Sequence, residues 1–345
     1  MPYVFGVDGG ASNSRSIFIT DAGRVVFTGK GPGVNYHEVG ASNVSATISR
    51  LYQDALKAAR ARTDECLGVC LGLAGVGRRQ DHEMLSPLFD ECFGKERYVL
   101  LSDAEVALTG GAISESGIII IAGTGSMAYG RNDKQQTGRI GGYGPLLSDE
   151  GSGYRIALKA LQAIARCNDG FPAPTSLTEA VFAHLKIKSF DEMVSWIYSP
   201  AAGRERIAAL APLVMRAASE DDPIADEILN QEADALALRV ELLSKRLELP
   251  ERVDVVLSGG LFSQAANYSL IVKRKICYLL PGANVIPPKL EPVIGAALYA
   301  LSLAGIALDE DMLDTIKRTY QEALQAKPVT DEPPIDEALS ASENQ

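Results

Sequence analysis

The chain has 345 residues, of which 46% are hydrophobic and 22% charged, so it is long enough for two domains and too apolar to be disordered. Its formal net charge of -11 argues against nucleic acid and against an anionic membrane surface as partners. No apolar run reaches membrane-spanning length, and the five cysteines show neither zinc spacing nor a disulfide framework, so we expect a cytoplasmic protein with reduced thiols.

The first third of the chain predicts a mixed sheet with helices packed on it. Three β-rich runs joined by short turns indicate an antiparallel meander, and helices then alternate with strands. The expected strands are residues 3–7, 15–20, 24–30, 69–73 and 98–101, and the expected helices are residues 43–62 and 82–92. Apolar residues recur at spacings of three and four in the first helix, from Val44 to Ala59, which is typical of a core-facing stripe.

The same order of elements begins again at Gly117, which predicts a second α/β domain. A strand at residues 118–121 is followed by a glycine turn, a return strand and a largely helical region. The later expected elements are helices at residues 154–167, 204–219, 225–247 and 308–324 and a strand at residues 253–257. We therefore divide the chain into residues 1–114, residues 115–307, a helix at 308–326 that packs back on the N-terminal domain, and an acidic flexible tail at 327–345.

Two strands run into glycine-rich turns of one design. The first is Val4-Phe5-Gly6-Val7-Asp8-Gly9-Gly10-Ala11-Ser12 and the second is Ile118-Ile119-Ile120-Ile121-Ala122-Gly123-Thr124-Gly125-Ser126. Glycines let backbone N–H groups approach phosphate oxygens, so two such turns can hold one polyphosphate from two sides. Only the first turn carries an acid, Asp8, where the second has Ala122. This asymmetry suggests that the first turn handles a metal ion or its water.

Other interpretations of the glycines are weaker. No stretch supplies the G-x-x-x-x-G-K-[ST] pattern of a Walker P-loop. Residues 123–128 fit the loose dinucleotide pattern G-x-G-x-x-A, but a return strand follows where that motif needs a helix. Either turn alone could merely close a hairpin, and their recurrence argues against this. A third turn, Ser258-Gly259-Gly260, leads into a helix and suits either a nucleotide contact or a plain connection.

Over residues 3–305 these motifs, in this order, resemble the actin-like ATPase superfamily of sugar kinases, specifically the N-acetylglucosamine kinase group related to the BadF/BadG ATPases. The stretches that carry the resemblance are residues 7–15, Gly31-Pro32-Gly33-Val34-Asn35, Ser102-Asp103-Ala104, residues 122–126, residues 141–152 and Ser258-Gly259-Gly260. The resemblance implies two actin-like (ribonuclease H-like) domains, each a mixed five-stranded sheet flanked by helices, with a cleft between them.

The resemblance also implies a set of site residues. ATP would be bound by Gly9, Gly10, Ser12, Arg15, Gly123, Thr124, Gly125, Ser126, Gly259 and Gly260. The sugar would be bound by Asn35, Asp103, Gly142, Tyr143, Gly144, Asp149 and Glu150. The chain departs from the family pattern at Ala11, Tyr143, Pro145 and Ser148, where the family usually has Gly, Trp, a polar residue and Gly. Three of these departures lie in residues 141–152, the stretch that the resemblance assigns to the sugar and that we call the sugar segment, so they bear on which sugar is bound.

Asp103 is the expected catalytic base, because it follows an apolar strand that can fix a carboxylate in a cleft, and Glu105 is its close rival. Without the resemblance Asp103 could equally be a helix N-cap. Asp8 is expected to hold Mg²⁺ through water, and the alternative role of Asp8 is to stabilise a tight turn. Asp149 and Glu150 could instead cap the helix that begins near Tyr154.

The expected activity is ATP-dependent transfer of the γ-phosphate to the 6-hydroxyl of N-acetylglucosamine. Glucosamine or N-acetylmuramic acid kinase activity remains an alternative, since these sugars differ only at C2 or C3. A different class of function is a BadF-type ATPase that activates a partner enzyme through an iron–sulfur cluster, for which Cys66 and Cys70 are the only closely spaced cysteines. Beyond ATP, Mg²⁺ and the amino sugar, the sequence leaves a homodimer open.

Overall fold

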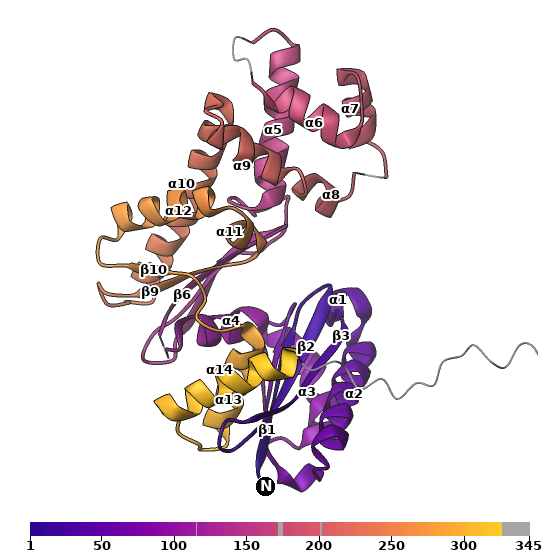
Figure 1. Ribbon diagram of the computed structural model, residues 1–345, viewed down its shortest axis with the longest axis vertical. Coiled ribbons are helices and arrows are strands. Elements are labelled where there is room, and N and C mark those ends of the chain that lie inside the picture. Colours follow the sequence, from indigo (N-terminus) through magenta and orange to yellow (C-terminus); the bar gives the residue numbers. More distant parts are fainter. Residues whose placement is uncertain (115, 172–174, 201, 326–345) are drawn as a thin grey trace, which may run out of the picture.

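The computed structural model describes residues 1–114, 116–171, 175–200 and 202–325, which form two α/β halves (Figure 1). The strands of the first sheet are β1 (Tyr3–Gly9), β2 (Asn13–Thr20), β3 (Val25–Pro32), β4 (Cys66–Leu73) and β5 (Tyr98–Ser102). Those of the second sheet are β6 (Gly117–Ala122), β7 (Ser126–Arg131), β8 (Thr137–Gly141), β9 (Asp254–Ser258) and β10 (Asn284–Ile286).

The two sheets share one topology. Their strand orders are β3-β2-β1-β4-β5 and, in the corresponding direction, β8-β7-β6-β9-β10. In each sheet the first three strands form an antiparallel meander and the last two add in parallel to the central strand. This confirms the predicted pair of mixed five-stranded sheets, and it explains why one motif of strand and glycine turn occurs twice in the sequence.

Helices cover both faces of the first sheet. These helices are α1 (Tyr36–Val39), α2 (Ala41–Ala59), α3 (Arg79–Phe93), α4 (Asp103–Ala112), α13 (Pro292–Leu303) and α14 (Glu310–Gln325). Apolar side chains of α2 and α3, such as Ile48 and Phe89, pack on one face with Phe5. On the other face Val4 packs with residues of α13 and α14. The alternation of Val4 and Phe5 between the two clusters follows from the two-residue period of a strand.

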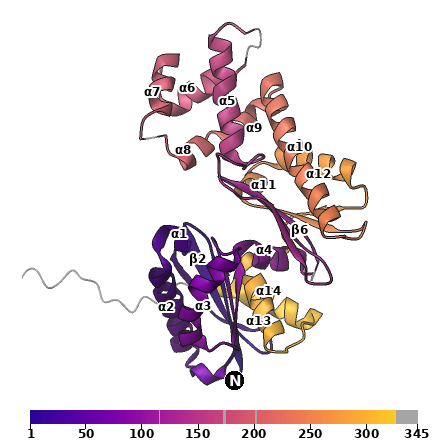
Figure 2. The same ribbon diagram turned by 180° about the vertical axis from the view of Figure 1, so that it is seen from behind.

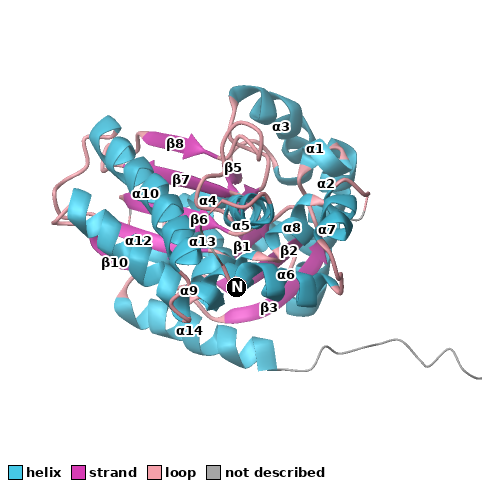
Figure 3. Cartoon of the chain, turned by 90° about the horizontal axis from the view of Figure 1, so that it is seen from above, coloured by secondary structure: helices cyan, strands magenta, loops and turns pink. Residues whose placement is uncertain are grey.

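The second sheet carries a larger helical layer. Its helices are α5 (Gly153–Asn168), α6 (Leu177–Leu185), α7 (Phe190–Ile197), α8 (Arg204–Ala208), α9 (Ala211–Ser219), α10 (Pro223–Arg246), α11 (Gly260–Gln264) and α12 (Ala266–Leu279). Seen from above, α10 lies across β6, β7 and β8 (Figure 3). The single helix expected at residues 204–219 is wrong, because the chain forms α8 and α9 there. Pro212 stands in the first turn of α9, where its missing N–H costs nothing.

Helix α4 lies between the two halves, as both side views show (Figures 1 and 2). Val106 belongs to the apolar cluster of the first sheet, whereas Leu108 packs with Ile119 and Val256 of the second. The backbones of α4 and α13 approach closely, since a Cβ on Gly295 would lie 2.0 Å from the carbonyl oxygen of Val106. Only glycine allows this approach. The helix α4 is therefore part of both hydrophobic cores.

The position of α13 differs from the expected division of the chain. Residues 115–307 were assigned to the C-terminal domain, yet α13 packs on the first sheet. A Cβ on Gly6 of β1 would lie 2.6 Å from the backbone nitrogen of Ala297. The run of small residues from Gly295 to Ala297 permits this contact between helix and strand, which no local sequence signal indicates.

Helix α14 also lies on the first sheet. The backbone N–H of Val25 in β3 donates to the Thr319 hydroxyl at 3.0 Å, and Ile316 and Tyr320 are buried against the sheet. Residues 327–345, the predicted flexible tail, lie outside the described residues. Within the described ranges, no helix is both long and apolar enough to cross a membrane.

Replacing Ile316 by alanine should show whether the docking of α14 stabilises the protein. Ile316 is fully buried, so Ile316→Ala is expected to lower the free energy of unfolding by about 2–5 kcal/mol. Leu324→Ala on the same helix, where the side chain is 44% exposed, should cost less than about 1 kcal/mol. Urea denaturation measures both. Equal small losses would mean that α14 does not stay docked in solution.

Candidate active site

The candidate residues of the first half lie at one edge of the first sheet. Strands β1, β4 and β5 are parallel and β3 runs in the same direction, so the C-terminal ends of all four meet at this edge. Asp8 lies near the end of β1, Asn35 follows β3 and Asp103 follows β5. The turn between β1 and β2 carries Gly9, Gly10 and Ser12. Ligands of open α/β sheets bind outside the C-terminal ends of the strands, which is where these candidate residues lie.

The second sheet presents an equivalent edge. The turn between β6 and β7 carries Gly123, Thr124, Gly125 and Ser126, and Gly142 follows β8. Gly259 follows β9, which pairs in parallel with β6. Its φ is 108° and a Cβ there would lie 2.3 Å from the carbonyl oxygen of Ala122, so only glycine fits. The second and third glycine turns are therefore adjacent.

Asp8 and Asp103 influence one another electrostatically. Burial raises the pKa of Asp8 to about 6, and the negative charge of Asp103 adds to this shift, while Arg15 opposes it. Burial also raises the pKa of Asp103. Two neighbouring carboxylates that are reluctant to ionise together are typical of sites that bind a cation or carry a proton.

The N-terminus of α4 shows that Asp103 is not the helix cap. Ser102 occupies the N-cap position and its hydroxyl accepts from the Glu105 backbone N–H at 3.3 Å, while the Glu105 carboxylate accepts from the Ser102 N–H at 2.8 Å. This capping box satisfies the helix end. The Asp103 carboxylate accepts from the adjacent Ala104 N–H at 2.9 Å and takes no part in the capping box. Capping is thus done by Ser102 and Glu105, and Asp103 remains available for chemistry.

Arg15, the predicted nucleotide contact, forms an ion pair with Glu291. Glu291 is the N-cap residue of α13, and its carboxylate also accepts from the Tyr320 hydroxyl of α14 at 3.1 Å. No sequence motif assigns a role to Glu291. Its position before Pro292 marks a helix start, but nothing local indicates a partner on β2.

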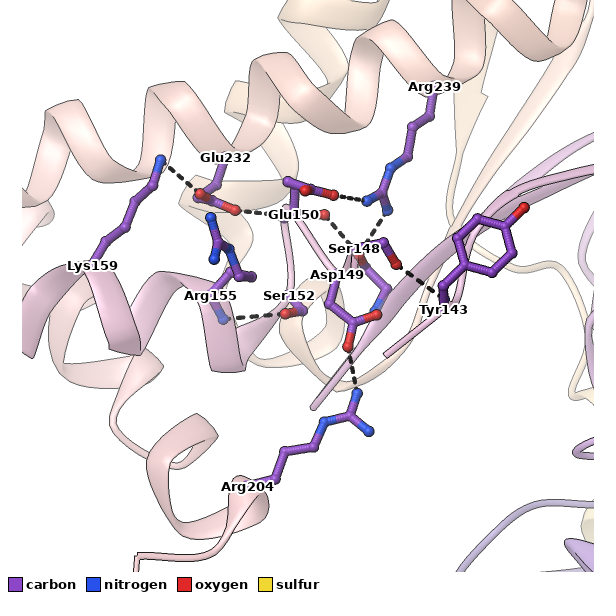
Figure 4. Close-up of polar contacts among 12 residues, drawn as sticks. Tyr143, Ser148, Asp149, Glu150, Ser152, Arg155, Lys159, Arg204, Glu232 and Arg239 are labelled. Atoms are coloured by element: carbon purple, nitrogen blue, oxygen red, sulfur yellow. Dashed lines mark hydrogen bonds and ion pairs between the residues drawn. The ribbon is translucent and has the colours of Figure 1, made fainter. Parts of the chain in front are cut away.

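The sugar segment is held by charged partners that the sequence did not identify (Figure 4). The buried Asp149 carboxylate accepts from Arg204 at 2.6 Å and from the Ser126 backbone N–H at 3.4 Å. Glu150 pairs with Arg239 of α10. Neither acid caps α5, since Ser152 is its N-cap. The alternative interpretation of Asp149 and Glu150 as caps is therefore wrong.

Two serines fix this segment to its surroundings. The Ser126 hydroxyl donates to the Glu150 carbonyl at 2.6 Å and accepts from Arg239 at 2.8 Å. Its single O–H donor is used, and it ties the second glycine turn to the sugar segment. Ser148, which replaces a family glycine, accepts from the Tyr143 N–H at 3.0 Å. The Tyr143 ring itself is 51% exposed, and the Arg139 guanidinium lies over it at 5.3 Å.

Asn35 belongs to a compact polar group. It caps α1, with its side chain accepting from the His37 N–H at 3.3 Å. Asp81 of α3 holds Tyr36, the residue after Asn35, by accepting a hydrogen bond from its hydroxyl. The Asp81 carboxylate also accepts from the backbone N–H of Arg78 at 2.7 Å. Burial opposes ionisation of Asp81, but the hydrogen bonds from Tyr36 and the backbone lower its pKa. The group places Asn35 firmly at the edge of the first sheet.

Arg139 of β8 connects the two edges. A Cβ on Gly77, in the loop after β4, would lie 3.4 Å from its guanidinium, and its charge partly offsets the raised pKa of Asp103. Asp149, by contrast, contacts residues of the second half in the bonds described above. The charges of Arg15 and Asp103 thus act on Asp8, and the charge of Arg139 acts on Asp103. The sugar segment lies beside the second glycine turn.

The carboxylates are compatible with a magnesium ion held in part by water. Mg²⁺ is usually bound through one or two carboxylates, with waters and substrate phosphates filling the remaining positions. Asp8 supplies one such carboxylate, and no cluster of three or more acidic, His or Cys ligands occurs in the described part of the chain. The raised pKa of Asp8 is the expected property of a carboxylate that a cation would neutralise.

A family model describing the BadF/BadG/BcrA/BcrD ATPases matches residues 5–300. The chain belongs to this ATPase family. It is 31% identical over 304 residues to an N-acetylmuramic acid/N-acetylglucosamine kinase of Clostridium acetobutylicum, covering 88% of this chain and 99% of the relative. It is also 31% identical over 309 residues to an N-acetyl-D-glucosamine kinase of Dictyostelium discoideum, covering 86% and 97%.

The fold of this chain is also similar to that of a solved sugar kinase structure. A ROK family glucokinase from Streptomyces griseus, in complex with glucose and AMPPNP, superposes with a TM-score of 0.53 at 17% identity, covering 87% of this chain and 99% of the glucokinase. Family and relatives together confirm the interpretation of the chain as an ATP-using phosphotransferase.

Replacing Asp8 should stabilise the free protein in a pH-dependent manner. The folded-state pKa is about 6 and the reference value 3.8, so ionised Asp8 costs stability above pH 6, and the cost shrinks as the pH falls toward 3.8. Asp8→Asn is expected to raise the free energy of unfolding at pH 8 by on the order of 1–3 kcal/mol and by much less at pH 4.

Urea denaturation at both pH values tests this, with Asp54→Asn on the exposed face of α2 as the control that should change stability little. If Asp8→Asn were less stable than the native protein at pH 8, burial and the charge of Asp103 would not raise the pKa of Asp8.

Proposed function

We propose that the protein is a kinase that transfers the γ-phosphate of ATP to the 6-hydroxyl of N-acetylglucosamine. Membership in the ATPase family and the two kinase relatives support an amino-sugar kinase. The observation that carries the proposal is the position of Asp103. Its carboxylate follows β5 at the sheet edge that also holds Asp8 and the first glycine turn, and it is not used as a helix cap.

In this proposal Asp103 orients the sugar hydroxyl and accepts its proton. Burial raises the pKa of Asp103, which favours proton uptake compared with an exposed aspartate. The two glycine turns, residues 9–12 and 123–126, hold the phosphates with N–H groups other than those of Gly10 and Gly123, which are bonded within their turns. Gly259 and Gly260 lie beside the adenosine. When bound beside Asp8, Mg²⁺ would neutralise charge on the phosphates.

The sugar would contact both halves. Asn35 follows β3 in the first half, where its amide nitrogen donates to the Glu38 carboxylate at 2.9 Å, and Gly142, Tyr143, Gly144 and Asp149 lie in the segment after β8. Glu150 acts as a support through its ion pair with Arg239. Glucosamine and N-acetylmuramic acid remain alternative substrates, because they differ from N-acetylglucosamine in the groups at C2 or C3.

The alternative of an iron–sulfur ATPase activator finds no support in the cysteines. Cys66 and Cys70 are buried in separate apolar clusters. Burial raises the pKa of the Cys66 thiol to about 11 and that of Cys70 as well, which opposes formation of the thiolates that cluster ligation needs.

The activity is tested by ADP release with Mg²⁺-ATP and a panel of sugars. The panel holds N-acetylglucosamine, glucosamine, N-acetylmannosamine, N-acetylmuramic acid and glucose, and NMR of the product locates the phosphate. We expect the highest kcat/KM for N-acetylglucosamine, with phosphate on O6. Release with none of the sugars would reject the kinase, and phosphate on another hydroxyl would reject the regiochemistry.

Asp103→Asn tests the base. It should lower kcat by about 10²–10⁴-fold while nucleotide affinity changes less than about twofold, because the amide keeps the shape but cannot take the proton. Glu105→Gln is the matched control, since glutamine can still accept from the Ser102 N–H and should preserve turnover. A larger kcat loss in Glu105→Gln than in Asp103→Asn would assign the base to Glu105.

A further inference from the structure

Arg204 is a cation of the site region to which neither the sequence motifs nor the proposed reaction assigns a role. It begins α8, in the helical layer of the second half. Its guanidinium donates to the Asp149 carboxylate at 2.6 Å (Figure 4), with the Arg204 side chain 42% exposed and that of Asp149 only 2% exposed. The arginine thus reaches from solvent to a buried acid of the sugar segment.

The same guanidinium lies directly against the second glycine turn. A Cβ on Gly125 would be 2.4 Å from its Nη2 atom, so the absence of a side chain at this position leaves the space that the cation occupies. The turn predicted to hold phosphate therefore has a positive charge beside it. The arginine is separated from this turn by 79 positions in sequence, and no motif connects them.

The second turn has fewer free donors than its sequence indicates. The Gly123 N–H is bonded to the Gly125 carbonyl at 2.9 Å, the Ser126 N–H to Asp149, and the Ser126 hydroxyl to the Glu150 carbonyl. A polyphosphate placed here needs charge as well as hydrogen bonds, and the chain lacks the lysine of a Walker P-loop. A guanidinium with a planar set of N–H donors suits phosphate oxygens.

We propose that Arg204 binds the terminal phosphates of the nucleotide at the second glycine turn, and that its ion pair with Asp149 is the nucleotide-free arrangement. The proposal rests on the proposed function only in taking this turn as a phosphate site. Because Arg204 is partly exposed and its stem is flexible, its head can exchange a carboxylate partner for a phosphate without movement of α8. AMP, which has no β- or γ-phosphate, gains nothing from this arginine.

Calorimetric titration with AMP, ADP and AMPPNP in the presence of Mg²⁺ and absence of sugar tests the proposal. Arg204→Gln should weaken AMPPNP binding about tenfold or more and change AMP binding by less than about twofold, as expected for loss of a charged hydrogen bond to phosphate. Arg204→Lys should restore part of the loss, because the charge remains. Arg206→Gln, on an exposed neighbour in α8, should bind all three nucleotides as the native protein does.

Arg204→Gln leaves Asp149 buried without its cation, so the single variant could fold poorly. The double variant Arg204→Gln/Asp149→Asn removes both charges and should show the same selective loss for AMPPNP over AMP. Equal weakening of all three nucleotides, or unchanged AMPPNP affinity in a folded variant, would overturn the proposal and leave Arg204 a structural partner of Asp149. Since no sugar is present, failure of the sugar panel would leave this result standing.

Discussion

The close contact between α4 and α13 holds the helix that is shared by both hydrophobic cores. Gly295 meets the backbone of α4 so closely that a Cβ there would lie 2.0 Å from the Val106 carbonyl and 2.6 Å from the Gly110 nitrogen. This contact fixes α4 on the first sheet, while Leu108 packs in the core of the second. Asp103 opens this helix, so the candidate base is positioned by both halves at once.

Paired charges are the second organising feature of the site. Among the described residues, three arginines near the glycine turns each contact a carboxylate, in the pairs Arg15–Glu291, Arg204–Asp149 and Arg239–Glu150. The pairs differ in exposure: the Arg239 side chain is 7% exposed, whereas those of Arg15 and Arg204 are 47% and 42% exposed. A buried arginine such as Arg239 is costly to leave without its partner and holds the framework, while partly exposed arginines can exchange partners when an anion arrives.

The repeated fold was readable because its signals are local. A glycine turn after an apolar strand, an apolar stripe such as that of α2 and a proline at a helix start each act within a few residues. Helix α13 shows the limit of such signals. Its apolar, small-residue sequence predicts a buried helix, but it contains nothing that selects the first sheet over the second, and the choice rests on its fit to Gly6 and Gly110.

Strand period and turn chemistry, which depend on neighbouring residues, predicted the first mixed sheet, the glycine turns and the acids Asp8 and Asp103 at strand ends. The family resemblance implied the second five-stranded sheet and the role of Asp149. The family match confirmed the resemblance. Which charges face one another is set by the packing of the elements in space. Arg204 and Asp149 are 55 positions apart and Arg15 and Glu291 are 276 apart. Such pairs arise from the packing of whole elements, because the interaction energy of two charges depends on their separation in space. They leave no periodic pattern along the chain.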